Sequence, residues 1–210
     1  MPRIHPVSEA SATDKVEQTY GRLREMFDST GPLPEPFLLY AAVPAFLQDF
    51  YMNFKKFCYT AGALDLKRKS LIALAVAGNF GCEPWAEFFA QRAKSQGADE
   101  QMIADVAAVA SSCAMYNAFF KFRDLSGSEL FSGMAVGLRA HTFAGTTLDD
   151  STVELINIVI SDLNGCKPCT EGHVTKARQL GLTDAQILEV VQCTSTLFAG
   201  IQFLKASGAA

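Results

Sequence analysis

The sequence predicts an all-α fold built from two internal helical repeats. Apolar residues recur at helical spacing along most of the 210 residues, whereas alternating runs of β-branched residues bounded by tight turns are nearly absent. The second half of the chain also repeats the pattern of the first half without a gap. Because 49% of the residues are hydrophobic, a chain of this length can bury a substantial core.

The helical pattern divides into successive segments with recognisable ends. Helices are expected over 13–27, 44–60, 66–79, 83–96, 99–122, 149–163, 167–180 and 183–206. The stretch GPLPEPF at 31–37 interrupts the pattern, and Gly181 with Thr183 gives a helix stop followed by a helix cap. Residues 124–148 are rich in Gly, Ser and Thr and have no clear period, so their role stays open.

The predicted organisation is one domain over residues 1–210. It contains an N-terminal helical extension at about 1–60, a first repeat at about 66–122 and a second repeat at about 149–206. Each repeat has a buried helix, a Gly-Cys-x-Pro turn, a middle helix, a glycine stop and a long final helix. Neither repeat could easily bury its own apolar helix alone, so we expect the two to pack about a pseudo-twofold axis.

Composition excludes several classes of function. The net charge is -4 and no basic stripe is present, which argues against nucleic acid as a partner. The N-terminal residues lack the apolar segment of a signal peptide, and no apolar run approaches the length of a membrane span. We therefore expect a cytoplasmic protein that does not enter a membrane.

The internal repeat separates structural positions from candidate chemical ones. Placing residue 166 on residue 82 aligns GCKPCTEGHVTKARQLGLTDAQILEV with GCEPWAEFFAQRAKSQGADEQMIADV. Residues shared by both copies are expected to build the fold; they are Leu155, Ile156, Gly165, Cys166, Pro168, Glu171, Ala177, Gly181, Ile187 and Val190.

Three positions change from groups that do not titrate near neutral pH to groups that ionise. Cys169 stands where the first repeat has Trp85, and His173 stands where it has Phe89. Glu154 stands where the first repeat has Ser70. Cys166 does not change, because the first repeat has Cys82 at the same position. These differences make Glu154, Cys166, Cys169 and His173 the candidate site.

The spacing of these residues favours one thiol site. Cys166, Cys169 and His173 are three and four residues apart, which places them on one face of a helix. The dipole of a helix N-terminus lowers a thiol pKa by roughly one unit. His173 must supply the rest of the activation, as a base or as a nearby cation. Glu154, among apolar neighbours, is expected to have a raised pKa and to act as a base.

The Cys-x-x-Cys motif also occurs in zinc sites and in thioredoxin-like redox pairs. A closed zinc site needs four ligands, but the chain has no second Cys-x-x-Cys, and no pattern in the sequence places His5 or His141 near the motif. A thioredoxin-like redox pair requires strands beside its helices. The remaining cysteines sit in apolar helical surroundings and are expected to be buried thiols; they are Cys58, Cys82, Cys113 and Cys193.

The spacing of the candidate residues resembles a motif of the AhpD-type alkylhydroperoxidases, which belong to the carboxymuconolactone decarboxylase superfamily. In this motif, eleven residues separate Glu154 from the Cys-x-x-Cys pair, and three more separate Cys169 from His173. Two stretches are most similar to the peroxidase branch of the superfamily: AMYNAFFKF at 114–122 and NGCKPCTEGH at 164–173. The stretches at 34–37, 62–64 and 71–75 are similar to the wider superfamily. The resemblance covers most of the chain and implies a single AhpD-like helical domain.

The resemblance also implies a reaction and its participants. A hydroperoxide would oxidise Cys169 to a sulfenic acid, Cys166 would resolve it as a disulfide, and Glu154 with His173 would relay protons. It implies no metal, haem or flavin, and an external dithiol such as dihydrolipoamide or a lipoyl protein as reductant. A peroxiredoxin can be a partner, and a homo-oligomer, a trimer or hexamer, is expected. Independently of the resemblance, Cys169 stands one turn into its helix while Cys166 lies beside the buried helix that carries Glu154, so we expect Cys169 to be the more accessible thiol.

One residue departs from the family pattern, and two other functions stay open. AhpD proteins commonly carry a histidine before the second cysteine, where this chain has Pro168. The physiological peroxide and reductant are therefore not determined.

A decarboxylase related to the lactone decarboxylases is an alternative, although those enzymes lack the cysteine pair. A redox-sensing oligomer without turnover is another.

Overall fold

The computed structural model describes residues 3–28 and 30–208, and within them every regular element is a helix. The predicted all-α fold is confirmed. The α-helices are α1 (Asp14–Phe27), α2 (Glu35–Tyr40), α3 (Pro44–Asn53), α4 (Leu66–Asn79), α5 (Glu83–Ser95), α6 (Glu100–Ser126), α7 (Glu129–Gly133), α8 (Asp150–Leu163), α9 (Lys167–Gln179) and α10 (Asp184–Ser207). A π-helical turn, η2, covers Phe54–Tyr59, and short 3-10 helices cover Glu9–Ser11 and His141–Ala144, the latter being η3.

Three segments differ from the predicted elements. The helix expected over 44–60 is α3 followed by η2. The proline-rich break at 31–37 contains the start of α2, because Pro36 occupies a first-turn position whose missing N–H needs no partner. The segment 124–148 contains the end of α6, then α7 and η3. The predicted domain extent of 1–210 runs beyond the described residues, and its boundaries stay a prediction.

The internal repeat is visible in the backbone. An offset of 84 converts the bounds of α4 into those of α8 and the bounds of α5 into those of α9. Gly81 and Gly165 both adopt left-handed φ angles, of 65° and 66°, which a glycine tolerates without strain. Cys82 and Cys166 follow them with nearly identical backbone angles at the start of the next helix. The two helical turns that carry the motif are therefore structurally equivalent.

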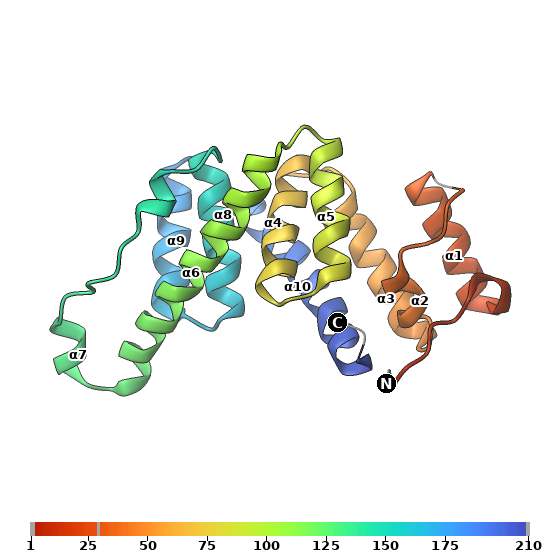
Figure 1. The fold of residues 1–210 in the computed structure, drawn as a ribbon, viewed down its shortest axis with the longest axis horizontal. Helices are drawn as coiled ribbons and strands as arrows, with labels where there is room; N and C mark the ends of the chain where they lie inside the picture. Colours follow the sequence, from red (N-terminus) through yellow and green to blue (C-terminus); the bar gives the residue numbers. More distant parts are fainter. Residues whose placement is uncertain (1–2, 29, 209–210) are drawn as a thin grey trace.

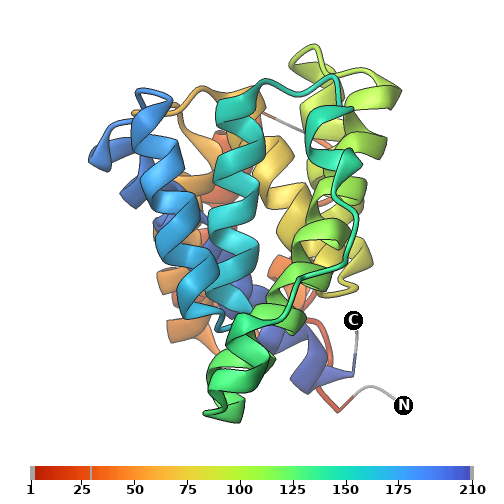
Figure 2. The same ribbon diagram turned by 90° about the vertical axis from the view of Figure 1, so that its left-hand side faces the viewer.

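The helices form an elongated body whose two ends differ. Figure 1 shows α1, α2 and α3 at one end, α4 and α5 in the middle, and α8 and α9 at the other end. Helix α4 is central, because it packs against α5, α6, α8 and α10. Figure 2 looks onto the end formed by α6, α8 and α9, where the chain between α7 and α8 runs along α6.

Carboxylates on the final helix of each repeat hold the start of the other repeat. Asp105 on α6 accepts hydrogen bonds from the backbone N–H and the hydroxyl of Thr147, at 2.6 and 2.7 Å, just before α8. Glu189 on α10 accepts from the N–H of Leu64, at 2.7 Å, just before α4, and pairs with the buried ammonium of Lys69 at 2.8 Å. The two repeats are therefore tied together reciprocally.

The N-terminal extension fills the first repeat with aromatic rings. Trp85 and Phe89 on α5 are fully buried, and the indole N–H of Trp85 donates to the Tyr40 hydroxyl at 2.9 Å. The rings of Phe37, Phe50 and Phe54 surround Trp85 at centroid distances of 5.2 to 5.7 Å. These edge and tilted contacts stabilise beyond simple burial. The extension therefore occupies the space beside the first Gly-Cys-x-Pro turn.

Gly200 on α10 lets two of these rings approach the helix. A Cβ atom at this position would lie 2.5 Å from both the Phe50 ring and the Tyr40 hydroxyl. We therefore expect Gly200→Ala to lower the free energy of unfolding by about 1–3 kcal/mol, through overpacking. Chemical denaturation measures this directly. Gly21→Ala on α1 is the control, because its Cβ meets open space; equal stability of both variants would contradict the packing described.

Two helices correct one expectation from the sequence. By length and composition, α6 and α10 are long and apolar enough to cross a membrane, so it was wrong that no apolar stretch approaches that length. Both helices pack against the rest of the fold: α6 against α4 and α8, and α10 against α2, α3, α4 and η2. This packing buries 33% of the most apolar window of α6 and 39% of that of α10.

Candidate thiol site

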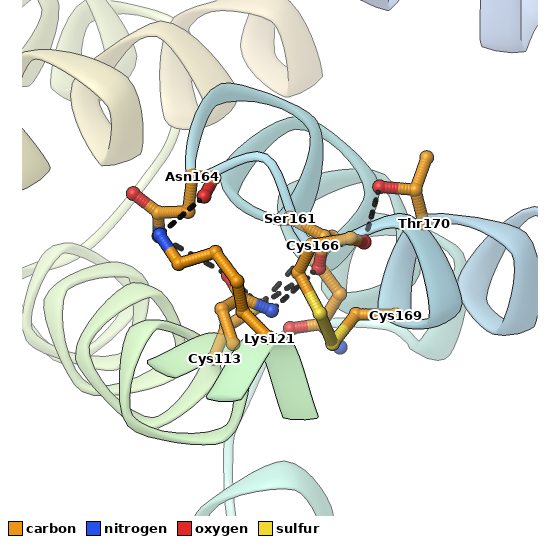
Figure 3. Close-up of a disulfide and its surroundings, with 9 residues drawn as sticks. Cys113, Lys121, Ser161, Asn164, Cys166, Cys169 and Thr170 are labelled. Atoms are coloured by element: carbon orange, nitrogen blue, oxygen red, sulfur yellow. Dashed lines mark hydrogen bonds between the residues drawn. A yellow bond between two sulfur atoms is a disulfide. The ribbon is translucent and has the colours of Figure 1, made fainter. Parts of the chain in front are cut away.

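The cysteine pair sits at the junction between α8 and α9. Helix α8 ends at Leu163, the left-handed Gly165 reverses the chain, and Cys166 takes the position before the first residue of α9. The carbonyl of Cys166 accepts from both the N–H and the hydroxyl of Thr170. Cys169 lies in the first turn of α9, and a disulfide joins its sulfur to that of Cys166 (Figure 3). This is the predicted disulfide.

The two sulfurs differ in their surroundings. Cys169 is 9% exposed and Cys166 is 1% exposed, which confirms the predicted order of accessibility. Cys169 forms part of the wall of a cavity of about 370 Å³. Cys166 instead borders a shallower and more polar depression with Asp162, Lys167 and Glu171.

His173 and Glu154 meet as the sequence predicts. The Nδ1 atom of His173 lies 2.8 Å from Oε2 of Glu154, which is almost fully buried on α8. The ammonium of Lys176, one turn further along α9, donates to the other carboxylate oxygen at 2.6 Å. The carboxylate thus joins two cationic side chains of α9 to the buried helix α8.

The predicted pKa of Glu154 was wrong in direction. Burial raises the pKa of this carboxyl, but the hydrogen bonds and charges of His173 and Lys176 outweigh burial and lower it below the usual value of 4.5. Glu154 is therefore ionised at neutral pH. It can orient and charge the imidazole, but it is a poor general base.

The surroundings of His173 raise the pKa of its imidazole above the ordinary value of 6.5. Burial lowers the pKa of His173, but the neighbouring Cys113 sulfur and the Glu154 carboxylate outweigh it and raise the pKa to about 9. The imidazole is therefore protonated at neutral pH, and of the two alternatives, base or cation, the geometry favours the cation. A cation beside Cys169 stabilises its thiolate.

Cys82 is an internal control for the effect of the helix terminus. It occupies the position in the first repeat that corresponds to Cys166, with the same backbone geometry. Burial raises the pKa of the Cys82 thiol above 9.0. A helix N-terminus alone therefore does not activate a thiol at this turn.

Sequence reasoning missed a buried polar group in which α6 of the first repeat meets the end of α8 in the second. The Cys113 sulfur on α6 lies 3.5 Å from the Ser161 hydroxyl, which accepts a hydrogen bond from Asn117 at 2.9 Å. Asn117 in turn accepts from Asn164 at 3.1 Å. The four other cysteines are buried as expected, but Cys113 also lines the cavity with Cys169 and His173.

The signal for this group was present in the repeat. Extending the offset of 84 along α6 and α10 pairs Cys113 with Leu197 and Asn117 with Ile201, and pairs Ser161 with Ala77. Each polar residue of the second site thus has an apolar counterpart. Lys176 was missed because its counterpart, Arg92, is also basic.

The segment 138–144 was also missing from the predicted site. Ala140 and Phe143 line the cavity, and the Tyr116 hydroxyl donates to the carbonyl of Leu138 at 3.1 Å. His141, which we could not bring to the site, lies on this segment but is exposed to solvent. Residues 3–28 and 30–208 contain no group of three or more His, Cys, Asp or Glu side chains placed to hold a metal ion.

The fold and the site together define a class: all-helical, two-repeat proteins with a cysteine pair at the start of a helix. The model of the carboxymuconolactone decarboxylase family matches residues 45–125 and again 130–210. The chain therefore belongs to the carboxymuconolactone decarboxylase family. The double match agrees with the two repeats seen in the backbone.

The relatives found by sequence include alkyl hydroperoxide reductases named AhpD. The chain is 24% identical over 157 residues to the protein from Coxiella burnetii, covering 74% of this chain and 88% of that protein. It is 27% identical over 157 residues to the protein from Maricaulis maris, covering 75% and 90%. The family resemblance drawn from the motif is thus confirmed.

Solved structures share the fold at low sequence identity. A putative gamma-carboxymuconolactone decarboxylase subunit from Burkholderia xenovorans has a TM-score of 0.62 and 16% identity, over 92% of this chain and 97% of that one. A peroxidase-related protein with an AhpD core from Ralstonia eutropha has a TM-score of 0.54 and 14% identity, over 98% and 93%. These similarities concern the fold alone.

Proposed function

We propose that the protein is a thiol-dependent hydroperoxide reductase with Cys169 as the attacking thiol. The observation that carries this proposal is the position of Cys169, in the wall of a cavity that His173 also lines, with its sulfur joined to Cys166. The AhpD-named relatives support an enzymatic role. Cys169, Cys166, His173 and Glu154 are the proposed catalytic set.

The first half of the reaction consumes the peroxide. The Cys169 thiolate attacks the outer oxygen of the hydroperoxide, the O–O bond breaks, and Cys169 becomes a sulfenic acid. The departing alkoxide takes a proton from the His173 imidazolium and leaves as an alcohol. Glu154 accepts a hydrogen bond from Nδ1 of His173, so the other ring nitrogen is the one available for this transfer.

The second half restores the thiols. The Cys166 sulfur attacks the sulfenic sulfur, water leaves, and the disulfide forms. An external dithiol, such as dihydrolipoamide or a lipoyl protein, then reduces the disulfide through two thiol–disulfide exchanges and is itself oxidised. We propose no resident metal, haem or flavin, a cytoplasmic location, and no nucleic acid or membrane partner. A peroxiredoxin is a further candidate partner.

Pro168 supports a relay that depends on His173 alone. It stands immediately before Cys169, where the AhpD pattern commonly has a histidine, and its side chain cannot transfer a proton. In this chain the imidazolium of His173, charged by Glu154, is then the proposed proton donor at the cavity. The physiological reductant can differ accordingly.

The cavity lining disfavours the decarboxylase alternative. A carboxylated lactone needs cationic or hydrogen-bonding groups around its carboxylates. Among the described residues that line the cavity, His173 is the only cation, and Glu154 already pairs with it. A redox sensor without turnover would still form the disulfide but would not consume peroxide continuously.

One assay tests the proposal against the sensor. Purified protein is mixed with cumene hydroperoxide or hydrogen peroxide, with dithiothreitol or dihydrolipoamide as reductant, and peroxide is followed over time. Turnover of many equivalents per chain supports the reductase. Consumption that stops at one equivalent, with dithiol still present, would support the sensor instead.

We further expect a closed homo-oligomer, a trimer or hexamer. Large apolar side chains are exposed on and around α7, and exposed apolar patches commonly mark interfaces. Leu125 and Leu130 are 76% and 72% exposed, and Phe122 and Met134 are more than half exposed. Sedimentation equilibrium at micromolar concentration should therefore give a multiple of 22.7 kDa, and a mass near 22.7 kDa would contradict this expectation.

A further inference from the structure

The cavity beside Cys169 has walls from three parts of the chain. Helix α6 contributes Tyr116 and Phe120, the segment around η3 contributes Ala140 and Phe143, and α9 contributes the floor. The floor residues are Pro168, Cys169, Gly172 and His173. Its volume of about 370 Å³ lies in the lower part of the range of roughly 300–1,000 Å³ for small-molecule sites.

The repeat explains why this cavity exists on one side only. Three aromatic residues of α5, Trp85, Phe88 and Phe89, correspond to Cys169, Gly172 and His173 of α9. In the first repeat, these three rings lie against one another at centroid distances of 5.1 to 5.9 Å. The second repeat has no ring at any of the three positions, and open space takes their place.

Gly172 is the replacement without an assigned chemical role. It lies inside α9 with no left-handed φ angle, and a Cβ atom there would meet nothing within 4 Å. A glycine inside a helix costs roughly 0.5–1 kcal/mol relative to alanine, so the backbone gains nothing from it. Its evident effect is to leave the cavity open directly beside Cys169 and His173.

The lining is apolar apart from the reacting groups. The Tyr116 hydroxyl is bonded to the Leu138 carbonyl, and the imidazolium of His173 is paired with Glu154. No described lysine, arginine, aspartate or glutamate lines the cavity. Aromatic walls without a free charge favour an uncharged apolar ligand, because a buried unpaired charge would be costly.

We propose that Gly172 determines the size of this cavity, so that the site accepts the bulky apolar body of an uncharged organic hydroperoxide and discriminates in its favour over a small peroxide. The inference rests on the proposed reductase function. The dithiol reductant is the competing occupant. The polar depression that Cys166 borders, with Asp162, Lys167 and Glu171, offers the dithiol a separate approach to the disulfide. The apolar cavity is thereby left to the peroxide.

Filling the cavity tests this inference. Gly172→Phe copies Phe88 of the first repeat and places a ring in the open space. We measure kcat/KM for cumene hydroperoxide and for hydrogen peroxide with dithiothreitol as the common reductant. The ratio of the bulky to the small substrate should fall at least about tenfold, within the usual range for steric discrimination in a pocket.

A matched control and a second variant guard against trivial causes. Gly21→Phe makes the same change on the exposed face of α1, where a side chain also meets open space, and should leave the ratio unchanged. Gly172→Leu introduces a smaller side chain and should give a smaller fall in the ratio, even if Gly172→Phe does not fold. Circular dichroism establishes folding of each variant.

The remaining outcomes separate this inference from the function on which it rests. If kcat/KM falls equally for both peroxides in the Gly172 variants, the reductant or the chemical step needs the open space, and the inference is overturned. An unchanged ratio overturns it as well. If the unmodified protein consumes no peroxide at all, the proposed function fails. Calorimetric binding of 2-phenyl-2-propanol, an unreactive analogue, then tests the cavity alone: Gly172→Phe should abolish it, and absent or unaltered binding would refute the inference.

Discussion

Cys169→Ser is expected to abolish hydroperoxide reduction. Serine keeps the size of the side chain but cannot form a sulfenic acid or a disulfide. Cys169 and Cys113 both line the cavity with His173, but of these two only Cys169 lies at the start of α9 and is joined to Cys166. The measurement is peroxide consumption with dithiothreitol, and the expected rate is that of the reaction without enzyme.

Cys166→Ser should give a different result from Cys169→Ser. Cys169 is still oxidised once per chain, but the sulfenic acid has no resolving thiol and turnover stops. Mass spectrometry after one equivalent of peroxide should find the sulfenic acid trapped on Cys169. A sulfenic acid on Cys166 in the Cys169→Ser variant, with activity retained, would reverse the two roles.

Cys82→Ser is the matched control for both changes. Cys82 occupies the equivalent turn of the first repeat, where serine is also a good helix cap. Its activity should equal that of the unmodified protein. Equal losses in all three variants would instead indicate a general effect of altering these turns.

His173→Phe is expected to lower kcat by roughly 10²–10⁴-fold, as for the loss of a general acid. The change copies Phe89 of the first repeat, so the helix should accept the ring. His173→Gln keeps a hydrogen-bonding group but cannot carry charge, and it should lose activity to a similar extent. His141→Phe, on the exposed part of η3, is the control and should retain activity. Retained activity in His173→Gln would mean that orientation matters more than charge.

The titration of His173 also predicts how stability depends on pH. Its pKa in the folded protein, about 9, lies above the ordinary value of 6.5, so the folded state holds the proton more tightly. This contribution to stability is complete below pH 6.5 and is lost as the pH rises through about 9. The contribution of Glu154, whose pKa is lowered from 4.5, is present above pH 4.5 and is lost as the pH falls.

Denaturation across this pH range tests the charge assignment. The free energy of unfolding of the unmodified protein should decline between pH 6.5 and 9 in a way that His173→Phe does not share. Activity should decline above about pH 9 as the imidazolium loses its proton. A His173→Phe variant with the same pH-dependent decline in stability would contradict the assignment.

The parts of the site that could be predicted from sequence are those that one turn and two consecutive helices position. Cys166, Cys169 and His173 are tied by helical spacing, and Glu154 comes from the preceding helix. The gapless repeat supplied a comparison at each position. The fold class followed from the same periodicity, because helical spacing is a local property.

The remaining parts depend on contacts between distant segments. Tyr116 and Phe120 come from a helix more than forty residues before the motif, and Phe143 comes from a segment without a clear period. No local pattern reports that they surround Cys169. The direction of the Glu154 pKa shift required the hydrogen bonds of His173 and Lys176 to the carboxylate, whose distances spacing alone does not give.

The hydrogen bonds between the two repeats have a consequence for a protein that contains only one such repeat. Part of the cavity wall comes from α6, the last helix of the first repeat, whereas Cys169 comes from α9 in the second. Asp105 and Glu189 likewise each hold the beginning of the opposite half. A chain that consisted of one half alone would have to pair with a second copy of itself, and such a dimer would carry two identical sites. In a single chain the two halves need not be identical, and here aromatic rings around Trp85 fill the place that the thiol site takes in the other half.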